Sequence, residues 1–388
     1  MNHGLHGLGS LTLAIMCIGA VFAADPAITV SAKQRYPWNG LVDLHFTITG
    51  TSGMRYDTSF TAKEMVGNTN IAMRTIRKAD GTAAAAKEQL LPGTYNWVWD
   101  AAADLPKDFK CDRVTVTGTA LEMKLYMVID LSSGSNSSSY PVSYLDAVPS
   151  GGWSDTYKTT KLILRRIEPG SFIMNGTYTV NLTKPYYMGV FEATQKQWQL
   201  VMGNRPSSYS SSGWESHPVE KVVWETIRGT ASTYNWPNNK GVAPTSFMGK
   251  LRSRTGLDFD LPTEAQWEYA CRAGTTTDYN NGTSATAANM AKVGRSHDNG
   301  SVSAKVGSYL VNGWGLYDMH GNVLELCLDW MGSLSNATDP VGPTSGSSRV
   351  GRGGIFDGYY YKCTSSYRLT MPTSDSNDDG FRVCLTLQ

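Results

Sequence analysis

Charge is scarce in this chain, which has 388 residues of which only 17% are Asp, Glu, Lys or Arg. The 34 basic and 33 acidic side chains balance to a net charge of +1, and no basic stripe stands out. Nucleic acid is therefore not an expected partner, because nucleic-acid binding proteins concentrate positive charge on one face. Apolar residues make up 41% of the chain, enough to fill a core, and the composition is not that of a disordered protein.

Long apolar runs are also missing beyond the N-terminus, so no membrane span is expected in the mature chain. Residues 8–22 are mostly apolar, and residues 21–23 place small side chains before a cleavage point. This pattern predicts a secretory signal peptide over residues 1–24 and a secreted, periplasmic or cell-surface protein. An uncleaved anchor is the alternative, and a lipid anchor on Cys17 is disfavoured by the bulky Met16 before it.

Cysteine is infrequent, and loss of the signal peptide removes Cys17. The five cysteines that remain are Cys111, Cys271, Cys327, Cys363 and Cys384. In an exported protein an odd number predicts one or two disulfides and a free thiol.

Several common catalytic signatures are absent. The chain has no P-loop, no nucleophile elbow and no dinucleotide-binding fingerprint. The histidines after the signal peptide are widely separated, and none forms a helical pair; they are His45, His217, His297 and His320. A zinc or iron site is therefore not expected.

Residues 25–120 have the features of an all-β domain. Residues 41–49 alternate polar and apolar side chains as a half-buried strand does, and a turn follows at residues 50–53. Further short strands are expected at residues 94–99 and 114–117. This spacing predicts an immunoglobulin-like sandwich, a fold that more often binds or positions than catalyses.

Residues 121–164 are expected to connect this domain to a second one. A Ser/Gly/Asn-rich loop is predicted at residues 132–139. The second domain, residues 165–388, contains two capping boxes, Thr194–Gln197 and Thr263–Gln266, each expected to begin a helix. Few helices, short strands and long loops predict an irregular α+β domain.

A series of motifs in this second domain resembles one known family. They are Gly170–Met174, Glu192–Thr194, His217–Glu220 with Val223–Trp224, Leu261–Gly274, Gly315–Val323, Arg352–Gly354 and Gly380–Arg382. In this order they resemble the formylglycine-generating enzyme family, also called FGE-sulfatase or sulfatase-modifying factor, over residues 165–388. The resemblance implies a loop-rich fold related to C-type lectin-like domains. It also implies an activity that oxidises a cysteine in a sulfatase peptide.

The family's oxidation uses copper held by two cysteines shortly after the Gly-Gly strand, and soft thiolates suit Cu(I). Here the first of these positions is Gly358, and the second falls on Cys363 if no gap is introduced. The family's serine after Gly-Gly is Ile355, and its tryptophan after Asn-x is Leu324. The resemblance therefore predicts a family pocket without copper and without formylglycine-generating activity.

A gapped alignment gives Cys363 another role. The segment from Cys363 to Arg368 then matches the family's structural Cys-x-x-x-x-Arg, and the resemblance implies a disulfide between Cys271 and Cys363. Such a bridge would stabilise the fold by ~4 kcal/mol. A bridge between Cys327 and Cys384 remains open.

The family also binds structural calcium around its Gly-Asn segment. Carried over by position, the ligands are the carboxylates of Asp318 and Glu325 with the carbonyl oxygens of Gly321 and Val323. The alternative is that both carboxylates cap turns or pair with Arg352 or Arg382. A second and weaker site would use Asn289 and the Met290 carbonyl, completed by Asp298.

Tyr359-Tyr360-Tyr361 occupies the stretch where the family's copper cysteines would lie. These tyrosines are either a packed loop or an aromatic surface that recognises a peptide or a glycan. The function predicted from the sequence is a secreted, calcium-stabilised pseudo-enzyme or binding module. The alternative is an oxidoreductase of the same family that acts on a cysteine through a rearranged site.

Overall fold

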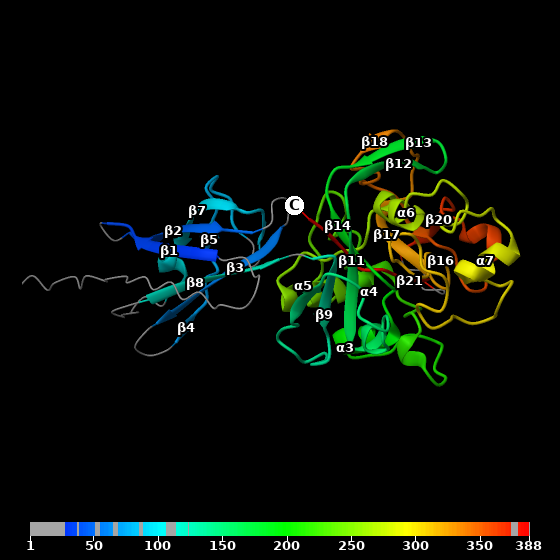
Figure 1. Ribbon diagram of the computed structural model, residues 1–388, viewed down its shortest axis with the longest axis horizontal. Coiled ribbons are helices and arrows are strands. Elements are labelled where there is room, and N and C mark those ends of the chain that lie inside the picture. The colour runs from blue at the N-terminus through cyan, green and yellow to red at the C-terminus, as the bar shows by residue number, and fades with distance from the viewer. Residues whose placement is uncertain are drawn as a thin grey trace, which may run out of the picture. The chain divides into compact units, whose positions relative to one another are not determined.

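The computed structural model describes residues 28–36, 39–50, 55–64, 69–84, 88–105, 114–122, 124–373 and 379–387. The predicted signal peptide, Cys17 and Cys111 lie outside these ranges. The chain divides into two compact units, residues 1–123 and 124–388 (Figure 1). None of the described helices is long and apolar enough to cross a bilayer.

The described residues of the N-terminal unit form two antiparallel sheets and one short helix. The first sheet has the order β1 (Ile28–Gln34), β2 (Leu41–Ile48), β7 (Gly93–Asp100) and β5 (Ile76–Arg77). The second has the order β4 (Asn70–Ile71), β3 (Tyr56–Glu64) and β6 (Glu88–Leu90), with β8 (Val114–Glu122) also paired to β3; α1 spans Ala101–Asp104.

Strand β2 confirms the predicted alternation, since every second residue from Val42 to Ile48 is buried. Its Phe46 packs at 4.8 Å between ring centroids against Phe60 of β3 and at 5.0 Å against Trp97 of β7. The two sheets therefore share one apolar core. The described residues of this unit are mostly β with one short helix, α1, while the immunoglobulin-like sandwich stays a prediction.

The segment expected to connect the two domains instead belongs to the C-terminal unit. It contributes β9 (Tyr126–Asp130), β10 (Val142–Leu145) and most of β11 (Lys161–Ile167). With β14 (Tyr186–Gly189) and β22 (Cys384–Thr386) they form a five-stranded sheet in the order β10-β9-β11-β14-β22. Four of the five residues of β9 are buried, so this stretch forms part of the core.

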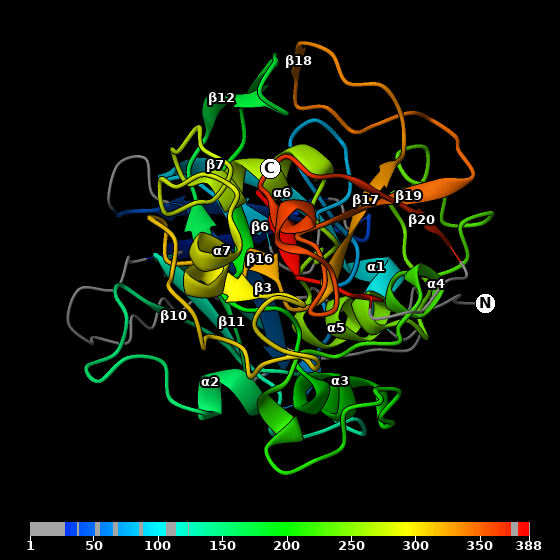
Figure 2. The same cartoon turned by 90° about the vertical axis from the view of Figure 1, so that its right-hand side faces the viewer.

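The other strands of this unit form smaller sheets. These are β12 (Gly170–Met174), β13 (Tyr178–Leu182) and β18 (Ala337–Thr338); β15 (Gly294–Arg295) and β16 (His320–Gly321); and β17 (Leu324–Trp330), β19 (Ser348–Arg352), β20 (Leu369–Pro372) and β21 (Asp379–Gly380). The sheet of β12, β13 and β18 lies at the opposite end of this unit from α3 (Figures 1 and 2).

The described helices of this unit are short. They are α2 (Thr156–Thr159), α3 (Gln195–Met202), η1 (Trp214–Ser216), α4 (Trp224–Ile227), α5 (Phe247–Thr255), α6 (Glu264–Arg272), α7 (Ala287–Val293) and η2 (Tyr360–Cys363). Both predicted capping boxes are present, Thr194 with Gln197 at α3 and Thr263 with Gln266 at α6. Helix α6 is capped at its C-terminus by Ala273, which adopts the left-handed conformation.

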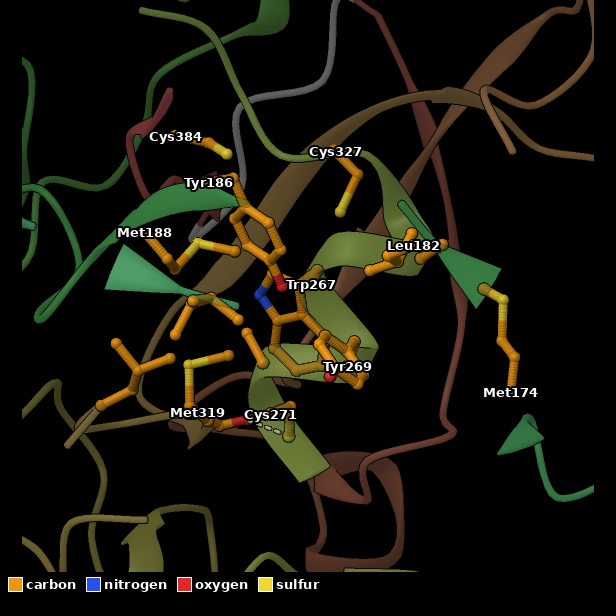
Figure 3. Close-up of a cluster of buried hydrophobic side chains, with 14 of the residues drawn as sticks. Met174, Leu182, Tyr186, Met188, Trp267, Tyr269, Cys271, Met319, Cys327 and Cys384 are labelled. Carbon is orange, nitrogen blue, oxygen red and sulfur yellow. Dashed lines mark hydrogen bonds between the residues drawn. The ribbon is translucent and has the colours of Figure 1, made fainter. Parts of the chain in front are cut away.

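Helix α6 lies in the core, and all of its residues are buried. Trp267 packs in a cluster with Tyr186, whose hydroxyl donates to the carbonyl of Gln266 (Figure 3). The helix's Glu268 is fully buried and pairs with Arg272 and Arg352. This pairing satisfies charges that would otherwise be costly to bury.

Candidate functional site

The candidate site begins at the tight turn after β19. Gly353 and Gly354 have φ values of +90° and +83°, a conformation that favours glycine. A Cβ atom on Gly354 would lie 2.6 Å from the sulfur of Cys363 and 2.8 Å from the carbonyl oxygen of Lys362. The absence of a side chain therefore lets η2 pack directly against the end of β19.

Three of the four predicted pocket positions lie on the segment that follows. The amide of Gly358 donates to the carbonyl of Ile355 at 3.0 Å, and the Gly358 carbonyl accepts from the amide of His297 at 2.9 Å. The fourth pocket position, Leu324, is on β17. A Cβ atom added to Gly351 of β19 would lie 2.6 Å from Cδ2 of Leu324, so the two residues pack closely. The segment 355–363 is called the site turn below.

Cys363 is the thiol of the site turn, and it is fully buried. Its sulfur lies 3.8 Å from the carbonyl oxygen of Tyr359. Burial raises the pKa of the Cys363 thiol to about 12. Burial therefore disfavours the thiolate, which is the nucleophilic form of the group.

The predicted disulfide between Cys271 and Cys363 is not formed, because both are free, as are Cys327 and Cys384. The sulfur of Cys271 lies 3.6 Å from the Ser365 hydroxyl and 3.8 Å from Nε2 of His320. The other ring nitrogen of His320, Nδ1, is 2.7 Å from the Cys363 carbonyl oxygen. Ser365, two residues beyond Cys363, thus faces the thiol that was expected to form the bridge.

The outer side of the site turn is aromatic. Tyr359 and Tyr361 are each 49% exposed, and their rings are parallel to within 6° at a centroid distance of 6.0 Å. The exposed ring of His297 lies 5.1 Å from Tyr359. We call these three side chains the tyrosine surface.

Main-chain hydrogen bonds hold the site turn in place beneath the tyrosine surface. The amide of Tyr360 donates to a carboxylate oxygen of Asp298 at 2.9 Å, and its carbonyl accepts from the hydroxyl of Tyr279 at 2.8 Å. The tyrosine surface therefore rests on an anchored segment.

Beside β17 lies a buried ionic cluster that includes the predicted calcium ligands. Glu325 accepts from Arg382 through both carboxylate oxygens and from the indole Nε1 of Trp267 at 2.7 Å. Arg382 also donates to the carbonyls of Gly189 and Tyr317, and the arginine is fully buried. The alternative expected for Glu325, pairing with Arg382, is what the structure contains.

The sequence prediction did not include Glu192 in this cluster. Its carboxylate accepts from Nδ2 of Asn322 at 2.6 Å and from the amide of Val323 at 3.1 Å. Burial raises the pKa of Glu192 well above its usual value, and the neighbouring Asp318 raises it further. Glu192 lies in one of the family-like motifs, and this was the only sequence feature that could have indicated its place in the cluster.

Asp318 is buried in a left-handed conformation with φ of +55°. One carboxylate oxygen accepts from the amide of Gly307 at 2.5 Å, and the other, Oδ1, has no hydrogen-bond partner in the described part of the chain. Burial raises the pKa of Asp318 to about 6. An unpartnered buried carboxylate oxygen is a feature that a bound cation would satisfy.

The predicted calcium ligands thus differ in how they fit a cation. Asp318 fits, whereas Glu325 has both oxygens engaged. At the weaker predicted site, Oδ1 of Asn289 lies 3.2 Å from Nζ of Lys292, and the Met290 carbonyl accepts from the amide of Gly294. Within the described ranges, no group of three or more His, Cys, Asp or Glu side chains is placed to hold a metal ion.

Comparison with known proteins places the C-terminal unit in context. A family model described as "Sulfatase-modifying factor enzyme 1-like domain" matches residues 155–387. The mouse formylglycine-generating enzyme is 30% identical over 184 residues, which cover 42% of this chain and 49% of that protein. The chain thus spans about half the length of this relative.

Two further similar proteins do not carry the name of a formylglycine-generating enzyme. A serine/threonine-protein kinase pkn1 of Chlamydia caviae is 33% identical over 181 residues, covering 44% of this chain and 24% of the kinase. Among solved structures, Treponema denticola variable protein 1 is 26% identical with a TM-score of 0.49. That similarity covers 58% of this chain and 95% of the Treponema chain.

Proposed function

Because this chain belongs to the sulfatase-modifying factor enzyme 1-like family, we propose that it is an exported binding module which uses the family scaffold without copper-dependent cysteine oxidation. One observation carries the proposal: the site turn contains Gly358 and the fully buried Cys363, and it presents the tyrosine surface outward.

The chemistry of the thiols supports this proposal. A Cu(I) site of the family's kind needs two thiolates, and position 358 has no side chain at all. A Cβ atom added to Gly358 would lie 3.2 Å from Ile355 Cγ1 and 3.3 Å from the Ile355 carbonyl oxygen, tighter than most such contacts. The site turn is therefore packed closely at the point where a second sulfur would be needed.

The tyrosine surface supplies the recognition part of the proposal. Two parallel, half-exposed phenol rings offer both flat faces and hydroxyl groups, which suit the rings of a glycan or the side chains of a peptide. The N-terminal unit, which we propose to be immunoglobulin-like, offers a second surface of the kind used for attachment.

Copper binding is the first test of the proposal. We expect that titration of the full chain with Cu(I), under reducing conditions and with a competing chromophoric chelator, shows no tight stoichiometric binding. We also expect no copper-dependent O₂ consumption with a cysteine-containing peptide. Tight binding that is lost in Cys363→Ser would contradict the proposal and favour the oxidoreductase alternative.

Removal of the tyrosine surface is the second test. A glycan array and a peptide array would be screened with the full chain and with the double variant Tyr359→Ala/Tyr361→Ala. We expect ligands retained by the native protein to bind the variant at least about tenfold more weakly, since each aromatic contact contributes roughly 0.5–1.5 kcal/mol beyond its buried area. Tyr36→Ala, at a fully exposed tyrosine of the N-terminal unit, is the matched control and should not change binding.

Calcium remains a proposal that rests on Asp318. The ion would be held by the free oxygen of Asp318 with nearby main-chain carbonyls, and it would offset the buried charge of Asp318 beside Glu192. We expect EDTA to lower the melting temperature of the native protein, excess calcium to restore it, and Asp318→Asn to be insensitive to both. A native melting temperature unchanged by EDTA would show that the calcium proposal is wrong.

A further inference from the structure

A cavity of about 320 Å³ lies in the C-terminal unit, outside the site turn. The buried Leu182, Leu261 and Leu328 are among its lining residues, and so is Trp236. Lys184 and Lys240 also line it, and both are exposed. A volume of this size falls within the range of small-molecule sites, where an apolar lining is combined with a few polar groups.

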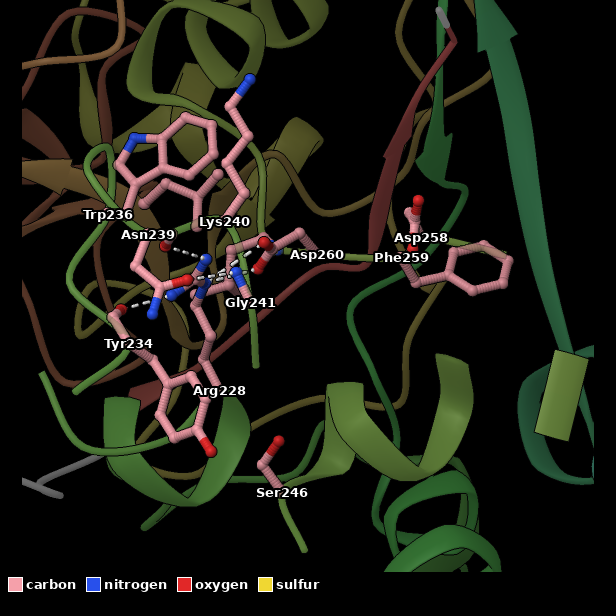
Figure 4. Close-up of polar contacts among 12 residues, drawn as sticks. Arg228, Tyr234, Trp236, Asn239, Lys240, Gly241, Ser246, Asp258, Phe259 and Asp260 are labelled. Atoms are coloured by element: carbon pink, nitrogen blue, oxygen red, sulfur yellow. Dashed lines mark hydrogen bonds and ion pairs between the residues drawn. The ribbon is translucent and has the colours of Figure 1, made fainter. Parts of the chain in front are cut away.

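Two arginines fix the loop that carries the indole and one of the lysines. Arg228 donates to the carbonyls of Tyr234 at 2.5 Å and Asn239 at 3.3 Å (Figure 4). Arg252 donates to the carbonyl of Lys240 at 3.2 Å.

The tip of this loop has a further anchor, because the indole nitrogen of Trp236 donates to the Val341 carbonyl at 3.1 Å. The wall of the cavity is therefore held in place by several hydrogen bonds before any ligand arrives, which reduces the entropy lost on binding.

Internal contacts already engage two of the cavity's acidic groups. Asp260 accepts from Arg228 at 2.9 Å and from Arg252 at 2.9 Å. Asp339 accepts from both the amide and the hydroxyl of Thr183. A third carboxylate, Asp258, is mostly exposed and lies 3.9 Å from Arg252.

The two lysines of the lining differ from these carboxylates in the contacts of their charged groups. Within the described ranges, the ammonium groups of Lys184 and Lys240 have neither a hydrogen-bond nor an ion-pair partner. The two lysines are therefore free to meet a ligand, while Asp258 and Asp339, both exposed, keep their negative charges, because hydrogen bonds from Thr183 do not neutralise Asp339.

We propose that this cavity binds a carboxylate attached to an apolar or aromatic group. The apolar group would lie against Trp236 and the lining leucines, and the carboxylate would reach the ammonium groups of Lys184 and Lys240. Charge-assisted hydrogen bonds to a carboxylate contribute more than neutral ones, so the anion orients the ligand while apolar burial supplies the rest of the affinity. The chemistry is shared by a small free acid and by the C-terminal residue of a peptide.

Calorimetric titration of the full chain with 3-phenylpropionate tests the proposal. We expect saturable binding that becomes about tenfold weaker or more in Lys184→Gln/Lys240→Gln, as expected when charge-assisted hydrogen bonds are lost. The native protein should bind neutral 3-phenylpropanamide, and also acetate, which lacks the apolar group, at least as weakly as the double variant binds 3-phenylpropionate. Lys292→Gln, at an exposed lysine of α7 outside the cavity lining, is the matched control and should bind as the native protein does.

The source of the carboxylate is decided by two peptides that end in phenylalanine, one with a free C-terminus and one amidated. Tighter binding of the free-acid peptide than of 3-phenylpropionate assigns the site to peptide C-termini, and the reverse order assigns it to small acids. Equal binding of acid and amide, no effect of the lysine substitutions, or no saturable binding overturns the proposal. Tyr359→Ala/Tyr361→Ala should leave this binding unchanged, so the two proposed sites can fail separately.

Discussion

Arg382→Met should lower the free energy of unfolding of the C-terminal unit by about 3–5 kcal/mol, the range observed when one partner of a buried ion pair is removed. Arg382 is fully buried and donates to Glu325 as well as to two main-chain carbonyls. Its removal leaves the carboxylates of Glu325, Glu192 and Asp318 buried without their cation. Because Met fills a similar volume, the loss reports on charge more than on packing.

Hydrogen exchange of the β17 amides, measured in the full chain at increasing urea concentrations, reports the free energy of unfolding of the C-terminal unit. Arg205→Met is the matched control, because Arg205 is exposed and stacks on Trp214 at 3.6 Å without an ion pair in the described ranges. We expect that control to change stability by less than about 0.5 kcal/mol. The double variant Arg382→Met/Glu325→Met should recover part of the loss. If Arg382→Met and Arg205→Met lower the free energy of unfolding equally, the buried cluster is not held together by charge.

Gly354→Ala should destabilise the C-terminal unit by about 3 kcal/mol or more, since the new methyl group meets both backbone and sulfur atoms. The added Cβ would lie within 2.8 Å of the Lys362 carbonyl oxygen, and the φ of +83° adds a conformational cost. Accommodating it requires η2 to move away from β19, so the tyrosine surface should also lose its ligand.

Gly176→Ala separates these two contributions. Gly176 has a φ of +68°, yet nothing lies within 4 Å of a Cβ placed there. It should therefore show only the conformational cost of about 1 kcal/mol. Thermal unfolding of both variants measures the difference. If the two substitutions cost the same, the close contact between Gly354 and η2 is not a constraint on the site turn.

The sequence was informative where the signal is contained in a few neighbouring residues. The alternation over β2 is a pattern of period two, and the capping boxes of α3 and α6 are complete within four residues. The order of family motifs identified the C-terminal domain, and glycine at position 358 excluded a second thiolate there. Each of these conclusions depends on residue identity and local spacing alone.

Tertiary structure decided the pairings between distant residues. The carboxylate of Glu192 meets Asn322 across 130 positions, and the Cys271 thiol meets Ser365 across 94, two residues beyond the cysteine expected from alignment. Residues 124–164 joined the main sheet because β9 pairs with β11, and β11 pairs in turn with β14. Such contacts depend on which strands and turns the whole chain brings together, and a shift of one or two residues in a turn changes which side chain faces which. Local sequence patterns carry no information on that outcome.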